Sequence, residues 1–130
     1  MSGALMSVIL HKRAEEQRKE VRTMRTLDFI VDGQGLVKDP ECDFTKIVAG
    51  TKGYLRAHFT FDGSGWRGCR KVASFWIADK EYATLLDKDN TCYIPPEVLG
   101  EKYFRVSVTG GKDDGYMIKT NKVKVKQEVV

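Results

Sequence analysis

Residues 50–77, which read GTKGYLRAHFTFDGSGWRGCRKVASFWI, decide the fold of this chain. Apolar and polar residues alternate from Leu55 to Phe61, the period-two pattern of a half-buried β-strand. A glycine-rich turn follows at residues 62–68, because glycine reaches the positive φ angles that a reversal needs. A second alternating run covers residues 69–77. The stretch predicts two strands joined by a turn that carries a tryptophan, either as a hairpin or as a pair that crosses between sheets.

Similar alternating runs lie on both sides of this central pair. We expect further strands at residues 24–31, 80–86, 91–94, 103–109 and 116–127. Turn-forming residues separate the strands at intervals of about 8–12 residues, which is typical of an antiparallel sandwich. The sequence therefore predicts a mainly β domain over residues 26–130, an antiparallel β-sandwich of seven or eight strands.

The two tryptophans receive different assignments. Trp76 stands in the middle of a predicted strand and is expected in the core with Phe59 and Phe75. Trp66 stands between glycines, where it could form a lid on the core or an exposed contact, and the lid is favoured.

Residues 5–25 are predicted to form an N-terminal α-helix, because they contain good helix formers and no glycine or proline. A narrow apolar seam runs along this helix at heptad-like spacing. It consists of Leu10, Ala14, Val21 and Met24. Arg18, Arg22 and Arg25 supply positive charge beside the seam. Two interpretations remain open: the helix packs on its own domain, or residues 1–25 form an arm that docks on a neighbouring subunit.

The net charge of +4 is concentrated near the N-terminus. Residues 11–26 hold six Lys or Arg against three Glu, and the rest of the chain is almost neutral. A nucleic-acid reader usually shows a clustered basic face, so binding of nucleic acid is not expected of the domain. Lys122, Lys124 and Lys126 alternate along the last predicted strand and are expected to face solvent, where lysines guard against edge-to-edge aggregation. A phosphate-binding stripe is the less favoured interpretation.

Motifs for catalysis, metals and cofactors are lacking in the sequence. It contains no G-x-S-x-G elbow, no phosphate loop and no H-E-x-x-H. Cys42, Cys69 and Cys92 are widely spaced, which favours free thiols in a protein made in a reducing cytoplasm. Turn formation explains the acidic residues 87–90 better than an ion site does. We expect no enzyme activity, no metal, no cofactor, no secretory signal and no membrane span.

Six short motifs follow one another along the chain in an order that is typical of a known family of protein modules. They are FTF at 59–61, WRGCRKVASF at 66–75, YATLLD at 82–87, CYIPPEVL at 92–99, FRVSVTG at 104–110 and TNKV at 120–123. In this order, residues 43–127 resemble a small immunoglobulin-like module of structural proteins from phages that infect Gram-positive bacteria. Arg67 stands between the tryptophan and the glycine, where such modules often have an acidic residue.

The resemblance implies a virion component, made in the host cytoplasm, that is associated with a head, tail or baseplate. The helix would anchor the immunoglobulin-like domain to other virion proteins or to copies of itself. An alternative is an intracellular accessory protein that binds a host protein or nucleic acid through residues 11–26. A third possibility is a sandwich that binds cell-surface glycan through exposed Tyr54, Trp66 or Tyr103.

Overall fold

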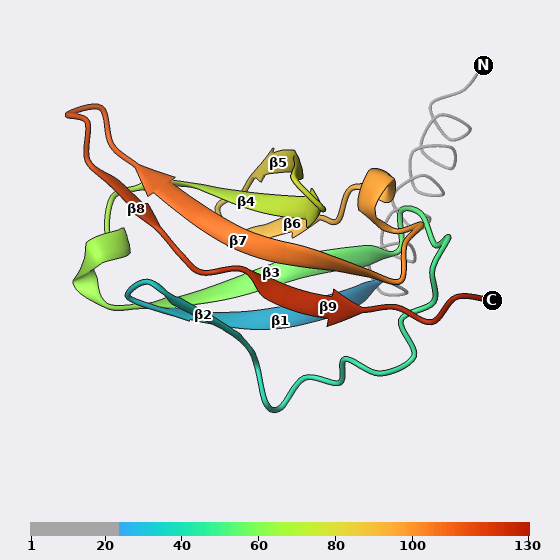
Figure 1. The fold of residues 1–130 in the computed structure, drawn as a ribbon. Coiled ribbons are helices and arrows are strands. Elements are labelled where there is room, and N and C mark those ends of the chain that lie inside the picture. The colour runs from blue at the N-terminus through green and yellow to red at the C-terminus, as the bar shows by residue number, and fades with distance from the viewer. Residues whose placement is uncertain (1–23) are drawn as a thin grey trace, which may run out of the picture.

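The computed structural model describes residues 24–130, and these residues form two β-sheets packed face to face (Figure 1). The strands are β1 (Arg25–Asp32), β2 (Gly35–Lys38), β3 (Leu55–Asp62), β4 (Arg70–Ile77), β5 (Lys80–Leu85), β6 (Thr91–Tyr93), β7 (Tyr103–Gly111), β8 (Met117–Lys119) and β9 (Val123–Lys126). Two short 3-10 turns, η1 (Ser64–Trp66) and η2 (Pro96–Val98), interrupt them. The prediction of a mainly β sandwich is confirmed.

The predicted helix over residues 5–25 lies almost entirely outside the described residues. Its last two positions are described, and there the prediction is wrong. Met24 has no helical conformation, and Arg25 is the first residue of β1. The apolar alternation of Leu27, Phe29 and Val31 extends the strand back to Arg25.

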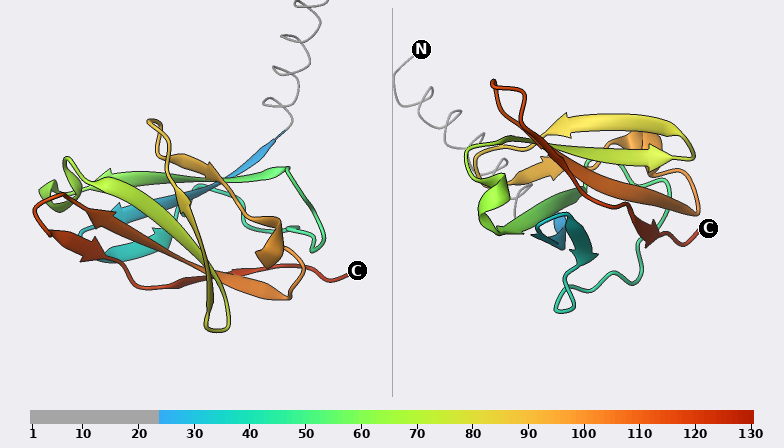
Figure 2. Two further views of the ribbon diagram at one scale, coloured as in Figure 1. Left: turned by 90° about the horizontal axis from the view of Figure 1, so that it is seen from above. Right: turned by 60° about the vertical axis from the view of Figure 1, so that its left-hand side comes forward.

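The first sheet has the strand order β2-β1-β3-β6 and the second has β5-β4-β7, with β8 and β9 pairing with different parts of β7. Figure 2 shows the two layers from two further directions. The central pair crosses between the layers, because β3 belongs to the first sheet and β4 to the second. The turn that carries Trp66 therefore closes one end of the sandwich.

Strands β1 and β3 pair in parallel, which corrects the expectation of a wholly antiparallel sandwich. The short strand β2, which was not predicted, pairs antiparallel with β1. After β2, residues 39–54 carry the chain back to the level of Arg25, so that β3 starts there with Leu55 opposite Arg25. The long connection is what allows the parallel pairing, because two parallel strands cannot be joined by a tight turn.

The final predicted strand, residues 116–127, is divided into β8 and β9. At the division, the Thr120 hydroxyl accepts a hydrogen bond from the Val108 N–H at 2.9 Å. The Asn121 side chain accepts from the Leu36 N–H at 2.7 Å and donates to the Leu36 carbonyl at 3.1 Å. These side-chain bonds replace the regular ladder and tie the second sheet to β2.

The buried apolar side chains form one cluster between the sheets. Leu27, Phe29 and Val31 of β1 lie beside Phe59 and its neighbours on β3, on the same face of the first sheet. The second sheet contributes Phe75, Phe104, Val106, Val108 and Val125. Ile47 is buried in the connection before β3, and Phe44 packs against the cluster. The inward-facing positions predicted from alternation on β1, β3 and β7 are confirmed.

The core assignment of Trp76 is corrected, whereas the favoured assignment of Trp66 to the core is confirmed. Trp66 is 1% exposed and is the largest fully buried side chain of the core. Trp76 is only half-buried, on the outer face of β4, where its N–H donates to the Ser107 hydroxyl at 2.9 Å. The alternation within β4 places Ala73 and Phe75 inward, so Trp76 points outward.

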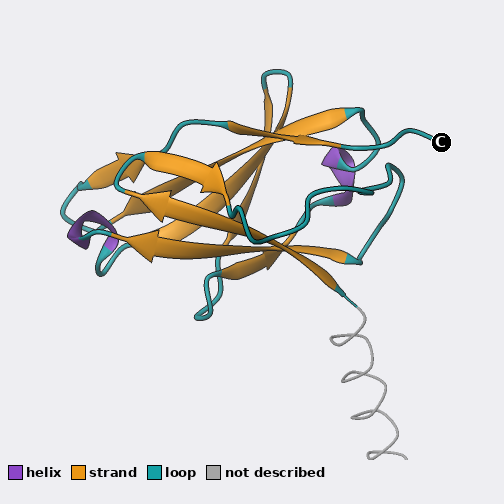
Figure 3. Cartoon of the chain, turned by 90° about the horizontal axis from the view of Figure 1, so that it is seen from below, coloured by secondary structure: helices purple, strands orange, loops and turns teal. Residues whose placement is uncertain are grey.

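The sandwich has two distinct ends, which are visible in Figures 1 and 3. The start of β1 and the C-terminus lie at one end, called the Arg25 end. The η1 turn and the β7–β8 loop lie at the other, called the Trp66 end. Eight residues of β1 separate the two ends, about 25 Å at the usual rise of a strand.

Candidate functional site

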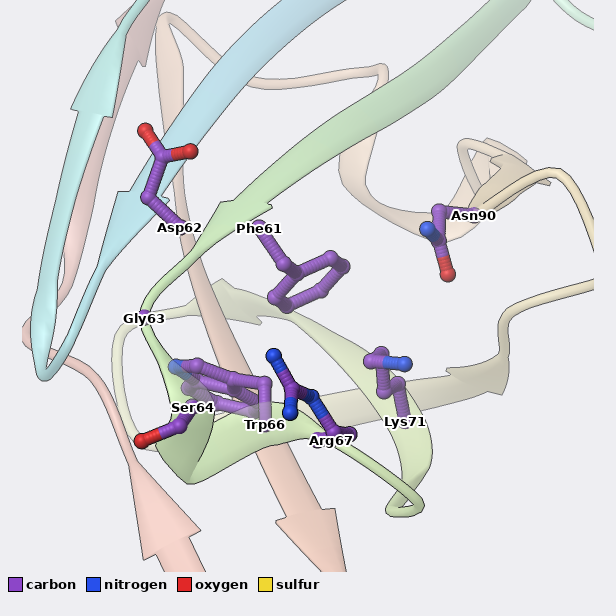
Figure 4. Close-up of a pocket in the computed structure, with 8 residues that line it drawn as sticks. All are labelled: Phe61, Asp62, Gly63, Ser64, Trp66, Arg67, Lys71 and Asn90. Atoms are coloured by element: carbon purple, nitrogen blue, oxygen red, sulfur yellow. The ribbon is translucent and has the colours of Figure 1, made fainter.

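A hollow of about 450 Å³ opens at the Trp66 end (Figure 4). Its walls come from the end of β3, the η1 turn, the start of β4 and the turn after β5. The lining residues are Phe61, Asp62, Gly63, Ser64, Trp66, Arg67, Lys71 and Asn90. Segments that are far apart in the sequence therefore meet at this one place.

Trp66 forms the rigid back wall of this hollow. Gly63 has φ +95°, a conformation that turns the chain from β3 into η1 and that other residues rarely adopt. The indole N–H donates to the Gly33 carbonyl at 2.7 Å, and the ring packs 5.0 Å from the ring of Phe61, measured between centroids. A Cβ on Gly110 would lie 2.9 Å from the indole carbons. Trp66 thus fills the gap between the β1–β2 turn and β7, and its buried position suits it poorly to contact a partner directly.

The polar groups of the hollow are mainly hydrogen-bond donors. Lys71 holds its ammonium 5.0 Å from the centroid of the Phe61 ring, and Arg67 is exposed beside Trp66. Figure 4 shows the Asp62 carboxylate and the Ser64 hydroxyl pointing away from the ring of Phe61, while Asn90 approaches from the opposite side. An anionic or polar group could be held against the aromatic wall by Arg67, Lys71 and Asn90.

A second hollow of about 300 Å³ shares Lys71 and Asn90 with the first. Asp87 in its wall accepts hydrogen bonds from the N–H groups of Asp89 and Thr91 at 2.9 and 3.0 Å. These bonds shape the turn, in keeping with the turn interpretation of residues 87–90. Within residues 24–130 no cluster of three or more metal-ligating side chains occurs.

His58 is paired with a carboxylate on the outer face of the first sheet. Its Nδ1 lies 3.1 Å from Oδ1 of Asp28, and both side chains are partly exposed. The nearby Cys42 thiol accepts from the Asp28 N–H at 3.3 Å and contacts the Thr26 carbonyl. Burial raises the pKa of Cys42, whereas a nucleophilic thiol needs a lowered pKa. Cys42 is therefore placed to cap the free edge of β1 rather than to react.

The residues proposed as a helical docking surface are now partly placed. Leu10, Ala14, Arg18, Val21 and Arg22 lie outside the described residues. Met24 contacts the first sheet, where its sulfur accepts from the Tyr93 hydroxyl at 3.6 Å. Arg25 donates to the carbonyls of Asp43, Thr45 and Lys46 at 2.7–3.0 Å. Its guanidinium holds the connection before β3, so Arg25 belongs to the sandwich and not to an arm.

The three aromatic residues proposed as an exposed contact do not form one surface. Trp66 is buried, which corrects its assignment as a contact residue. Tyr54 and Tyr103 are 44% and 39% exposed, but Tyr54 precedes β3 of the first sheet and Tyr103 begins β7 of the second. The hollow at the Trp66 end depends instead on Lys71 and Asn90, which sequence reasoning missed. No local pattern relates these two residues, because only the packing of the β5–β6 turn against β4 brings them together.

No family model matches the chain, and comparisons with curated proteins and with solved structures give no match. In the part of the chain that the structure describes, no helix is long and apolar enough to cross a membrane. The inference of function therefore starts from the arrangement of the residues themselves.

Proposed function

We propose that this protein is a non-enzymatic structural component of a bacteriophage virion. The sandwich serves as an immunoglobulin-like module that decorates the head or adapts one protein to another in the tail or baseplate. The segment before β1 anchors the module to neighbouring subunits.

The observation that carries this proposal is the separation of the two ends of the sandwich. The N-terminal segment joins the domain at the Arg25 end, where Arg25 and Met24 fix the start of β1 to the body of the sandwich. The hollow lined by Arg67 and Lys71 opens at the opposite end. A module attached through residues 1–23 would present the Trp66 end away from its anchor, which is the arrangement that a decorating or adapting protein requires.

The proposed anchor excludes Met24 and Arg25. Met24 and Arg25 are engaged within the sandwich, so the proposed docking seam is reduced to Leu10, Ala14 and Val21, with Arg18 and Arg22 beside it. Exposed ion pairs contribute only about 0–1 kcal/mol each, so we assign the affinity to the apolar seam and the orientation to the arginines.

Mass spectrometry of purified phage particles tests this proposal. The protein should be recovered at a fixed copy number per particle and should remain bound after washing in high salt. If the protein occurs only in the lysate, the accessory alternative is supported, in which the basic segment binds a host protein or nucleic acid. The glycan-binding alternative loses the buried Trp66 as a ring on which a sugar could stack and keeps only Tyr54 and Tyr103.

A further inference from the structure

The outer face of the second sheet carries an unusual concentration of positive charge. Five cations from three strands and their connection lie on it: Arg105, Lys119, Lys122, Lys124 and Lys126. Glu81 of β5 is the carboxylate nearest in register, opposite Trp76, and it accepts a hydrogen bond from the Ser74 hydroxyl. We call these five cations, together with Trp76 and Tyr103, the lysine face.

Aromatic rings hold several of these cations over the sheet. The Lys122 ammonium lies 3.7 Å from the ring centroid of Trp76. Lys124 and Arg105 lie 4.4 and 5.3 Å from the ring centroid of Tyr103. Such contacts restrict long side chains that would otherwise be free, so a ligand would find the charges already in place.

A hollow of about 260 Å³ lies within the lysine face, at the division between β8 and β9. Lys119 and Lys122 line it together with Trp76, Ser107 and Glu81, whose carboxylate accepts a hydrogen bond from the Ser74 hydroxyl. The Ser107 hydroxyl accepts the Trp76 N–H, so its own hydrogen is available to be donated. Two ammonium groups and a hydroxyl donor thus meet one carboxylate in the hollow, so its charge is net positive and it suits an anionic group.

Protection of an exposed strand edge against aggregation does not fully explain why these cations gather on the outer face. The residues just before and just after β9 are bonded to the first sheet and its connection: Asn121 binds Leu36, and Glu128 exchanges backbone hydrogen bonds with Ile47 and Ala49 at 2.7 and 2.8 Å. The edge left for charge to guard is thus the four residues of β9. Arg105 lies on the paired strand β7 and Lys122 lies before β9, so edge protection does not account for these two cations.

We propose that the lysine face binds an extended acidic segment of a partner protein. Lys122, Lys124 and Lys126 recur at every second residue, which spaces them about 6.6–6.8 Å apart along the strand. Every second side chain of an extended peptide recurs at the same spacing, so Asp or Glu at alternate positions would meet successive lysines in register. The hollow at Lys119 and Lys122 receives one carboxylate, and the intervening residues pack on Trp76 and Tyr103. This contact involves a surface different from residues 1–23 and does not depend on the virion assignment.

Fluorescence anisotropy with labelled synthetic peptides tests the proposal on the full-length protein. The probe alternates Glu and Thr over about eight residues, a length that spans Lys122, Lys124 and Lys126. A second peptide has the same composition with all Glu residues in one block. The binding variant replaces Lys122, Lys124 and Lys126 with Gln, and the matched control variant replaces Lys52, Lys88 and Lys112 with Gln. Both variants lose the same charge, and all six lysines are exposed, so folding is expected to be preserved.

We expect the alternating peptide to bind more tightly than the block peptide and to be released by salt. The binding variant should bind it roughly tenfold or more weakly, as three lost ion pairs imply, while the control variant should match the wild type. If both variants bound the alternating peptide equally weakly, binding would depend only on the net charge of the protein, and the proposal would be overturned. If the wild type bound the two peptides with equal affinity, the spacing of the Glu residues would not matter, and the proposal would again be overturned. Tighter binding of an oligothymidylate of equal charge would identify the face as a phosphate-polymer site instead.

Discussion

At single positions, the stability of the domain depends on how closely Trp66 is packed. Its N–H is bonded to Gly33, its ring meets Phe61, and its far edge lies against Gly110 of β7. The hollow at the Trp66 end uses the same indole as its wall. Substitutions here should change the stability of the whole domain and the shape of the hollow together.

Replacing Trp66 with Ala should lower the free energy of unfolding by about 3–5 kcal/mol, because it leaves a large cavity in the core. Trp76→Ala serves as the matched control and should cost about 1 kcal/mol, since Trp76 is half-exposed on the outer face. Urea denaturation of the two variants measures the difference. A larger loss for Trp76→Ala would mean that the two tryptophans have been assigned to the wrong faces.

Gly110→Ala tests the close approach of Trp66 to β7. The new Cβ would lie 2.9 Å from two indole carbons and 3.1 Å from Cβ of Cys69, so the ring must move. We expect a loss of about 1–3 kcal/mol in the free energy of unfolding and a change in Trp66 fluorescence. Gly111→Ala is the control, because its Cβ would meet nothing closer than 3.8 Å. Similar losses for both variants would attribute the effect to β7 itself and not to Trp66.

Cys92 should make the stability depend on alkaline pH. Burial, with a smaller effect of the Asp87 carboxylate, raises the pKa of this thiol from 9.0 to about 12. Above pH 9 the thiol ionises in the unfolded state but keeps its proton in the folded state, so the free energy of unfolding falls as pH rises toward 12. The slope from this one group approaches about 1.4 kcal/mol per pH unit. Cys92→Ala should show a shallower decline between pH 9 and 11 than the wild type, and identical slopes would refute the assignment.

At the scale of elements, the division between β8 and β9 joins the second sheet to β2. Asn121 satisfies both backbone groups of Leu36, a residue that is 1% exposed. The same segment carries Lys119 and Lys122 of the lysine face. The link to β2 thus helps to position a proposed binding surface.

Asn121→Ala should lower the free energy of unfolding by about 1–3 kcal/mol, because it leaves the backbone N–H and carbonyl of Leu36 without their partner. Gln34→Ala is a suitable comparison. Gln34 makes one exposed side-chain bond, to the Lys119 carbonyl, and its loss should have little effect. Chemical denaturation distinguishes the two, and hydrogen exchange should locate the Asn121→Ala effect at the Leu36 amide. Unchanged protection of that amide would contradict the role given to Asn121.

At the scale of the whole molecule, the described residues contain an extended core and an anchored first strand. Within residues 24–130 the buried apolar cluster extends from Leu27 to Val125, and Arg25 ties β1 to the connection before β3. We therefore expect the sandwich to fold without residues 1–23, which we assign to assembly.

Protein lacking residues 1–23 should fold with the melting temperature of the full chain but should fail to enter particles. Circular dichroism measures the first property, and complementation of particle assembly measures the second. Replacing Leu10 and Val21 with Asp in the full chain should also prevent incorporation, while Arg18→Gln should weaken it chiefly at low salt. Incorporation of the truncated protein would contradict the anchoring role. Loss of folding would instead show that the segment belongs to the core.

The sequence by itself determined the class of fold and which face of β1, β3 and β7 is buried. Alternation has a period of two in any strand, so Leu27, Phe29, Phe59, Phe104 and Val106 could be placed inward without knowing their partners. Strand order, the parallel pairing of β1 with β3 and the burial of Trp66 depend on contacts between distant segments. The local sequence pattern does not show which distant segments come into contact. The glycines around Trp66, for example, indicate a turn whether the tryptophan side chain is buried or exposed. The hollow and the lysine face were likewise decided only by the tertiary structure, because packing alone brings Asn90 beside Lys71 and Lys122 over Trp76.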